Sequence, residues 1–217
     1  MTQAGPGDSR RTSSAPVRSG RPRDASIDER AAAAVMRLLG EGTYRDLTLD
    51  RVAAEARTSK PALRRRWGSL PGVVVHTLIT VMGTSPTPDT GCLRCDLVTG
   101  IGGLAESIAS TPVTTALPGL IADLAGDPEL RERFTRDYFD ARRSTTRAVL
   151  ERARDQGALT PSTDIELVLD LLAAPLYYRA LFAHEAIDAD TAERIVDTLL
   201  DGLSVDAASN HPSAPDH

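Results

Sequence analysis

The stretch TYRDLTLDRVAAEARTSKPALRRRW, residues 43–67, decides the fold of this 217-residue chain. Its first half predicts a short amphipathic helix behind the N-cap candidate Thr48, because apolar residues recur at helical spacing. Those residues are Leu49, Val52, Ala53 and Ala56. Its second half predicts a helix that begins after the N-cap candidate Ser59 and has Pro61 in its first turn. A short helix, a turn and a cationic helix indicate a helix-turn-helix, which places its second helix in a DNA major groove.

The polar and basic side chains of this stretch are the candidate DNA contacts. Leu63 and Trp67, spaced i and i+4, are expected to face inward, which leaves the basic residues of the second helix to face outward. Helix N-termini bind phosphate, and arginines bind phosphates and guanine edges. The predicted DNA-binding residues are Thr48, Thr58, Ser59, Lys60, Pro61, Ala62, Arg64, Arg65 and Arg66.

The same segment resembles the DNA-binding domain of the TetR/AcrR family of bacterial transcriptional regulators. The family pattern T-x-x-x-[IV]-A, a turn, and S-K-x-x-[IL]-Y-x-x-[FW] is matched by Thr48, Val52, Ala53, Ser59, Lys60, Leu63 and Trp67. Arg57 stands where a turn glycine is usual, and Leu70 stands where a phosphate-binding lysine usually opens the fourth helix. Arg64 stands where the family has a phosphate-binding tyrosine, and we expect it to replace that contact with a stronger one.

Charge divides the chain into two parts. Residues 1–71 carry a net charge of +6 and residues 72–217 carry −11, within the total of −5. A basic head on an acidic body fits a DNA-binding domain attached to one that does not touch DNA. No stretch approaches the roughly 20 apolar residues of a membrane span, and no hydrophobic export segment opens the chain. We therefore expect a cytoplasmic protein without a membrane partner.

Helical periodicity continues along the chain, and no strand pattern interrupts it. The sequence predicts an all-α protein of about nine helices. The resemblance implies that these helices form an N-terminal three-helix helix-turn-helix domain and a C-terminal helical ligand-binding and dimerisation domain. The expected division is a disordered basic arm (1–24), the DNA-binding domain (25–70), the body (71–205) and a disordered tail (206–217). The arm either lies along DNA or is a solvated tail.

The resemblance implies that the last two long helices pair with their two-fold mates in a four-helix bundle. The matching segments are 164–185 and 190–203, which carry more apolar surface than one small body needs. The predicted interface residues are Leu171, Leu172, Ile195, Leu199, Leu200 and Leu203. The alternative is that these helices are only the core of a monomer.

The resemblance also implies a small-molecule cavity in the body, most recognisably in DLAGDPELRERF (123–134) and LLAAPLYYRALF (171–182). A mostly apolar wall with tyrosine hydroxyls would suit an apolar or aromatic effector. The predicted lining residues are Met82, Leu97, Ile101, Leu104, Leu117, Leu120, Ile121, Phe134, Tyr138 and Tyr177. The fourth helix, residues 69–82, is expected to carry the signal as the only element that joins head and body.

Cys92 and Cys95 form a CxxC pair without the further Cys or His ligands that a zinc site needs. The simpler interpretation is two incidental thiols at the start of a helix, and the alternative is a redox-responsive pair. No HExxH, GxSxG or phosphate-loop motif is present, so we predict no catalytic residue, metal or cofactor.

The predicted function is a homodimeric regulator, most simply a repressor, that an effector releases from a pseudo-palindromic operator in double-stranded DNA. Two alternatives stay open. One is a dimeric ligand-binding or interaction module without operator binding, and the other is an all-helical enzyme.

Overall fold

The computed structural model describes residues 25–83 and 86–203, so the predicted arm and tail lie outside the described residues. The described residues contain helices and no strand, which confirms the all-α prediction. The elements are α1 (Ala25–Glu41), η1 (Tyr44–Asp46), α2 (Leu49–Glu55), α3 (Lys60–Trp67), α4 (Leu70–Met82), α5 (Leu93–Ser110), η2 (Pro112–Ala116), α6 (Leu117–Ala125), α7 (Pro128–Phe134), η3 (Thr135–Asp140), α8 (Ala141–Asp155), α9 (Ile165–Phe182) and α10 (Thr191–Leu203).

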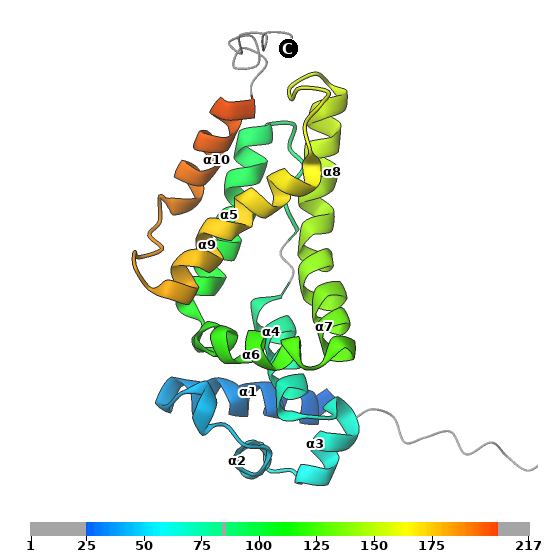
Figure 1. The fold of residues 1–217 in the computed structure, drawn as a ribbon, viewed down its shortest axis with the longest axis vertical. Coiled ribbons are helices and arrows are strands. Elements are labelled where there is room, and N and C mark those ends of the chain that lie inside the picture. The colour runs from blue at the N-terminus through cyan, green and yellow to red at the C-terminus, as the bar shows by residue number, and fades with distance from the viewer. Residues whose placement is uncertain (1–24, 84–85, 204–217) are drawn as a thin grey trace, which may run out of the picture.

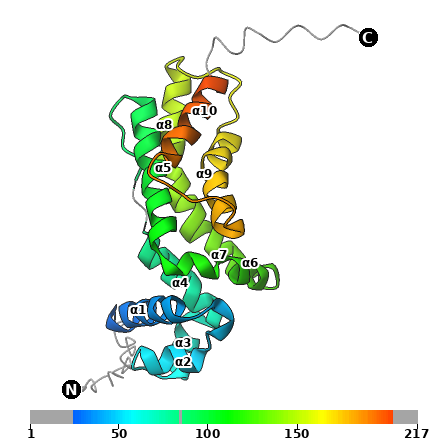
Figure 2. The same cartoon turned by 90° about the vertical axis from the view of Figure 1, so that its left-hand side faces the viewer.

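The molecule is elongated, with α1–α3 at one end and α5, α8, α9 and α10 at the other (Figures 1 and 2). Helices α4 and α6 lie between the two ends. The segments α7, η3 and α8 follow one another without a break and form one long helix. Counted as one, and with the short 3-10 segments η1 and η2 left out, they bring the number of helices in the described residues to nine. The division into domains at residue 70 stays a prediction.

The head is a three-helix unit around a small aliphatic core, in which Val35, Val52 and Leu63 are fully buried. Both predicted caps form in it. The Thr48 hydroxyl accepts a hydrogen bond from the Arg51 amide at 3.2 Å, and the Ser59 hydroxyl accepts one from the Ala62 amide at 3.3 Å. These caps fix where α2 and α3 begin, and so fix the turn between them.

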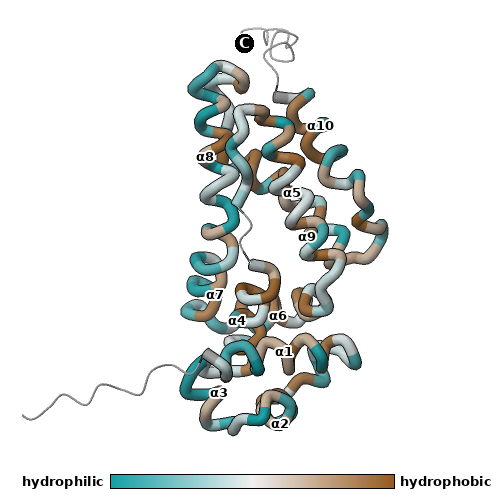
Figure 3. The backbone as a smooth tube through the Cα atoms, turned by 180° about the vertical axis from the view of Figure 1, so that it is seen from behind, coloured by the Kyte–Doolittle hydropathy of each residue, from teal (hydrophilic) through white to brown (hydrophobic). Residues whose placement is uncertain are grey.

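Helix α4 starts close against the end of α3. Its N-cap Ser69 accepts a hydrogen bond from the Gly72 amide at 3.2 Å. A Cβ at Gly72 would lie 2.1 Å from the Trp67 carbonyl oxygen, so only glycine fits here. Figure 3 shows that hydrophobic residues concentrate in α4, whereas α7 and α8 are mostly hydrophilic. Helix α3 is therefore joined to the largely buried helix α4 by a tight junction of two residues, Gly68 and Ser69.

A second contact joins head and body, which the sequence does not predict. The short helix η1 presents Tyr44 to α6, where its hydroxyl group and the Asp123 carboxylate are 2.5 Å apart. A Cβ at Gly119 would lie 2.2 Å from the Tyr44 ring, so α6 and η1 approach each other too closely for any side chain at position 119. The expectation that the fourth helix alone joins the two parts is wrong, because α6 also touches the head directly.

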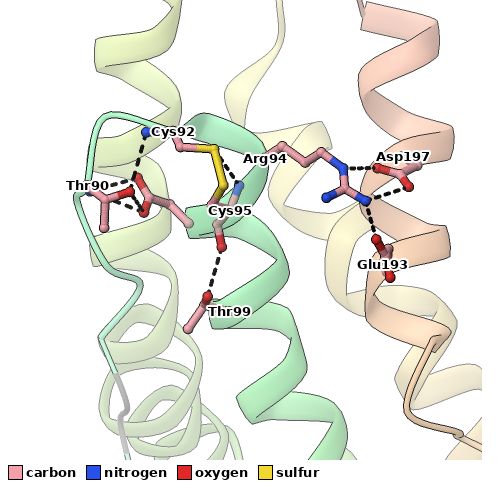
Figure 4. The surroundings of a disulfide bond; sticks show 8 residues. Thr90, Cys92, Arg94, Cys95, Thr99, Glu193 and Asp197 are labelled. Carbon is pink, nitrogen blue, oxygen red and sulfur yellow. Dashed lines mark hydrogen bonds and ion pairs between the residues drawn. A yellow bond between two sulfur atoms is a disulfide. The ribbon is translucent and has the colours of Figure 1, made fainter.

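The body packs α5 against α9 and α10. Arg94 on α5 bonds Asp197 on α10, with Nε and Oδ1 2.6 Å apart, and also pairs with Glu193 (Figure 4). No single helix among the described residues is long and apolar enough to cross a membrane; one pair, Leu93–Ser110 with Pro112–Ala125, passes by length and composition but is bent by 75°.

Cys92 and Cys95 lie at the exposed start of α5 (Figure 4). Cys92 is the N-cap residue, with its sulfur accepting a hydrogen bond from the Cys95 amide at 3.3 Å. The first helical turn brings the two Cα atoms to 5.2 Å, and the sulfurs are joined in a disulfide. The interpretation as two thiols is therefore wrong, whereas the redox-responsive alternative stays a hypothesis.

Candidate nucleic-acid interface and ligand cavity

Helix α3 lies at the end of the molecule farthest from the body (Figure 1), and its sequence includes Arg64 and Arg65. Arg64 and Arg65 are exposed, and neither guanidinium group makes a hydrogen bond or ion pair to another described residue. Lys60 is half-exposed, and its ammonium group lies 2.7 Å from the Asp50 carboxylate of α2. Two guanidinium groups are thus available to a phosphate or a guanine edge.

The other predicted DNA contacts gather around the start of α3 and the cap of α2. Thr48, Ser59 and Pro61 are exposed, while Thr58 and Ala62 are half-buried. The two capped N-termini lie on this part of the head, where backbone N–H groups and the helix dipole favour a phosphate. The structure brings these residues together, and their role in binding stays a prediction.

Arg66 does not face outward, contrary to the prediction. Its side chain is only 13% exposed and forms an ion pair with Asp28 of α1. The reason is its position on α3, three residues after Leu63 and one before Trp67, which places it beside the inward face. Arg66 thus links α3 to α1 through this ion pair and is not part of the candidate DNA surface.

A cavity of about 330 Å³ lies in the body between α5, α6, α7, η3, α8 and α9. Its wall is formed by Leu104, Leu117, Ile121, Phe134, Phe139, Arg142, Arg143, Asp170, Ala173, Ala174, Tyr177 and Leu181. Five of these are predicted lining residues: Leu104, Leu117, Ile121, Phe134 and Tyr177. That they bind a ligand stays a prediction.

The remaining five predicted lining residues do not border this cavity. Leu97 and Leu120 are buried in the core, because α5 and α6 turn those positions toward other helices. Met82 and Tyr138 are also buried and lie behind the wall, where the Tyr138 hydroxyl donates to the Met82 sulfur at 3.2 Å. Ile101 borders a neighbouring space of about 60 Å³.

The π-helical segment η3 explains why the sequence misses Phe139 and Arg142. A π turn closes i→i+5 hydrogen bonds, so residues five apart come to one side of the helix. Phe134 and Phe139 both reach the cavity in this way, with ring centroids 5.5 Å apart. A regular α-helix would turn Phe139 away, which is why 3.6-residue periodicity predicts only Phe134.

The charges around the cavity are unevenly paired. Arg143 bonds Asp170, and its Nη2 atom lies 3.0 Å from the Glu166 carboxylate. Hydrogen bonds from Arg147 and Arg143 lower the pKa of Glu166 to about 2, so this carboxylate is ionised at neutral pH. Arg142 has no such carboxylate partner among the described residues. The wall therefore holds one neutralised arginine beside one that is not.

Two tyrosine hydroxyls add polar groups beside the aromatic side chains. The Tyr138 and Tyr177 oxygens are 3.1 Å apart, so one hydroxyl donates to the other. Burial raises the pKa of each phenol above its ordinary value, so both stay protonated at neutral pH. The cavity wall is thus mostly apolar, and its polar groups are the Tyr177 phenol, the Arg142 and Arg143 guanidinium groups and the Asp170 carboxylate.

Helix α9 carries an apolar stripe on its outer face. Leu167, Leu171, Tyr178 and Phe182 are 53%, 43%, 57% and 66% exposed, at a spacing that keeps them on one side of the helix.

On α10, the predicted interface residues Ile195, Leu199 and Leu200 are half-buried, and the Leu203 side chain lies outside the described residues. Leu172 is 1% exposed and belongs to the monomer core, so its place in the predicted interface is wrong.

The described residues hold no group of three or more His, Cys, Asp or Glu side chains placed to hold a metal ion.

Comparison with known proteins agrees with this architecture. A family model described as "Tetracyclin repressor-like, C-terminal domain" matches residues 87–199. The chain is 30% identical over 171 residues to the DNA-binding transcriptional repressor TetR of Mycobacteroides abscessus, covering 78% of this chain and 89% of that relative. It is 28% identical over 191 residues to the HTH-type transcriptional regulator YdeS of Bacillus subtilis, covering 88% of this chain and 96% of the relative.

Among solved structures, that of the TetR family transcription regulator SCO0332 matches with a TM-score of 0.64 at 28% identity. The match covers 82% of this chain and 98% of the other. All three proteins are named as transcription regulators, and the solved structure shares the fold over most of its length. The chain belongs to the TetR family, and it is a transcriptional regulator of the helix-turn-helix type.

Proposed function

We propose that the chain is a homodimeric repressor that reads a pseudo-palindromic operator with α3 and leaves it when a small apolar effector binds in the body. The observation that carries the DNA-binding part is the pair of exposed, unpaired arginines on a doubly capped helix-turn-helix. Arg65 is assigned to a base edge and Arg64 to a phosphate, as the replacement for the family's tyrosine. A bacterial regulator with this target works in the cytoplasm.

The experiment is a selection of bound sequences from random duplexes, followed by titration of the selected duplex at several salt concentrations. Arg64→Ala should weaken all sequences alike and reduce the salt slope by about one unit. Arg65→Ala should cost about 1–3 kcal/mol on the selected duplex and relax the preference at one base pair. Arg131→Ala is the matched control, because Arg131 is an exposed arginine on α7 in the body.

Two results contradict this assignment. The first is binding that does not weaken as salt rises, since neutralised phosphates always release counterions. The second is wild-type affinity in both the Arg64→Ala and the Arg65→Ala proteins, because α3 would then not lie in the groove. The second result would favour an interaction module without operator binding.

The dimer is supported by the outer face of α9. Exposed apolar stripes of this kind mark interaction surfaces in proteins of this size. A two-fold dimer buries the same stripe on both copies and presents two heads to half-sites about 34–36 Å apart. We assign Leu171, Ile195, Leu199 and Leu200 to this interface, together with Leu167, Tyr178 and Phe182 on the same stripe.

The effector is supported by the size and lining of the cavity. Its volume of about 330 Å³ suits a small molecule, and its wall is largely aliphatic and aromatic. FadR of Bacillus subtilis, which shares the fold at 10% identity with a TM-score of 0.56, was crystallised in complex with stearoyl-CoA. At that identity the likeness concerns the fold alone, so the ligand class here depends on the residues of this cavity.

A further inference from the structure

Arg142 is unlike the other charged residues of the cavity wall. It enters from α8, with its guanidinium carbon 5.1 Å from the centre of the Tyr138 ring. One of its Nη2 hydrogens is donated to the Met82 carbonyl oxygen. Its Nε atom is buried and has no hydrogen-bond partner among the described residues. Of the five N–H donors that a guanidinium group carries, the described residues therefore use one.

We expect an arginine in such surroundings to bind an anion. A guanidinium group cannot lose its proton in a protein, and a buried charge is costly unless it is paired. Arg143, the next residue, shows the paired arrangement, since Asp170 and Glu166 both bond it. The protein thus leaves one guanidinium group of the cavity wall without a carboxylate of its own and neutralises the other.

We propose that the ligand of this cavity is a small apolar carboxylic acid whose carboxylate binds Arg142. The planar fork of arginine matches a carboxylate, and the pair is charge-assisted. The body of the acid would lie among Leu117, Phe134 and Phe139, with the Tyr177 hydroxyl beside it. The volume of about 330 Å³ is at the lower end for ligand pockets, which favours one ring with a short chain or a medium-length alkyl chain. This inference rests on the effector function proposed above.

The same arginine connects the ligand to the head. Met82 is the last residue of α4, and its carbonyl oxygen accepts the Arg142 hydrogen bond. A carboxylate that engages Arg142 competes with that carbonyl for the same donors. Occupation of the cavity thereby weakens the hydrogen bond at the C-terminal end of α4. Because α4 begins directly after α3, the bound acid favours a different position of the head.

The test compares acids with neutral molecules of the same shape on the full-length protein. The probes are 4-phenylbutanoate and octanoate, with 4-phenylbutanamide and octanamide as their uncharged counterparts, measured by isothermal titration calorimetry. We expect at least one acid to bind about 10- to 100-fold more tightly than its amide, the factor that a charge-assisted hydrogen bond provides. Arg142→Gln should abolish this preference, and Arg142→Lys should keep part of it because the charge remains. Arg131→Gln should keep it entirely.

The wild-type comparison needs no mutant, so the proposal stays testable if Arg142→Gln fails to fold. Equal affinity for acid and amide overturns it, as does the absence of saturable binding by either acid at millimolar concentration. The effector function is tested separately by adding the same probes to the complex with the selected duplex. Amides that bind as well as the acids and release DNA would keep the effector function and refute the carboxylate. An acid preference without any change in DNA affinity would support the carboxylate and refute the effector function.

Discussion

Arg57 adopts a left-handed backbone conformation, with φ at 50°, in the turn between α2 and α3. The TetR pattern has glycine there, and the left-handed conformation costs a non-glycine residue about 1–2 kcal/mol of conformational free energy. We predict that Arg57→Gly stabilises the protein by about 0.5–1 kcal/mol, because part of the gain is offset by the larger unfolded-state entropy of glycine. The unfolding midpoint in thermal denaturation should rise by about 2 °C.

Two substitutions provide the comparison. Ala183, which ends α9 with φ at 49°, should respond to glycine in the same direction. Ala54 is exposed on α2, so Ala54→Gly should lower stability by about 1 kcal/mol. If Arg57→Gly destabilises the protein as Ala54→Gly does, the left-handed turn is not the source of the strain.

Arg65 and Arg66 are neighbours with different tasks in this structure. Arg66 is mostly buried against Asp28, so Arg66→Met should reduce stability by about 1.5–3 kcal/mol, the range for hydrogen bonds to charged groups. Arg65 is exposed, so Arg65→Met should leave stability within about 0.5 kcal/mol. Urea unfolding of the two variants distinguishes these roles. An unchanged unfolding midpoint for Arg66→Met would contradict the structural role of Arg66 and leave it as a candidate DNA contact.

At the scale of elements, α6 has one side toward the cavity and another toward the head. Leu117 and Ile121 line the cavity, while Gly119 and Asp123 contact Tyr44 of η1. A shift of α6 on ligand binding would therefore reach the helix-turn-helix without passing through α4. We therefore propose this contact as a second route between the cavity and the head.

We predict that Tyr44→Phe weakens the coupling between effector and DNA while leaving the fold intact. The phenyl ring still packs against Gly119, but the hydrogen bond to Asp123 is lost. The ratio of DNA affinities with and without ligand should fall, and the midpoint of unfolding should change little. Gly119→Ala is the stronger perturbation, because its Cβ would lie 2.2 Å from the Tyr44 ring, at a cost of about 1–3 kcal/mol. Coupling that is unchanged in both proteins would exclude this route.

These elements also show how far the sequence predicts the structure. The caps Thr48 and Ser59 form as predicted, because an N-cap depends on residues within one turn. The π-helical segment is missed, because no local pattern in the sequence predicts a π turn. The short helix η1 is missed although its capping-box pair, Thr43 and Asp46, lies within one turn. The cavity follows the same division: residues at α-helical spacing are predicted, whereas Phe139 and Arg142 depend on the irregular turn.

For the whole molecule, the decisive feature is the unpartnered stripe on α9. Leu171 is 43% exposed while Leu172 is 1% exposed, so adjacent leucines test the interface and the core separately. In a two-fold dimer each copy of Leu171 would lie against its partner, and an aspartate there would bury two unpaired charges. We predict that Leu171→Asp gives a folded monomer with greatly weakened operator binding.

Leu172→Asp should instead unfold the protein, because the charge enters the core of the monomer. Val81→Asp is the matched control, since Val81 is 38% exposed on α4, away from the stripe. Light scattering at micromolar concentration reports the mass, and circular dichroism reports the helix content.

A Leu171→Asp protein that remains dimeric would place the interface elsewhere, and a monomeric wild type would contradict the proposed dimer altogether. Operator binding supplies the second readout: one head holds only one half-site, so a monomer that binds the selected duplex as tightly as wild type would contradict the two-fold mode of reading.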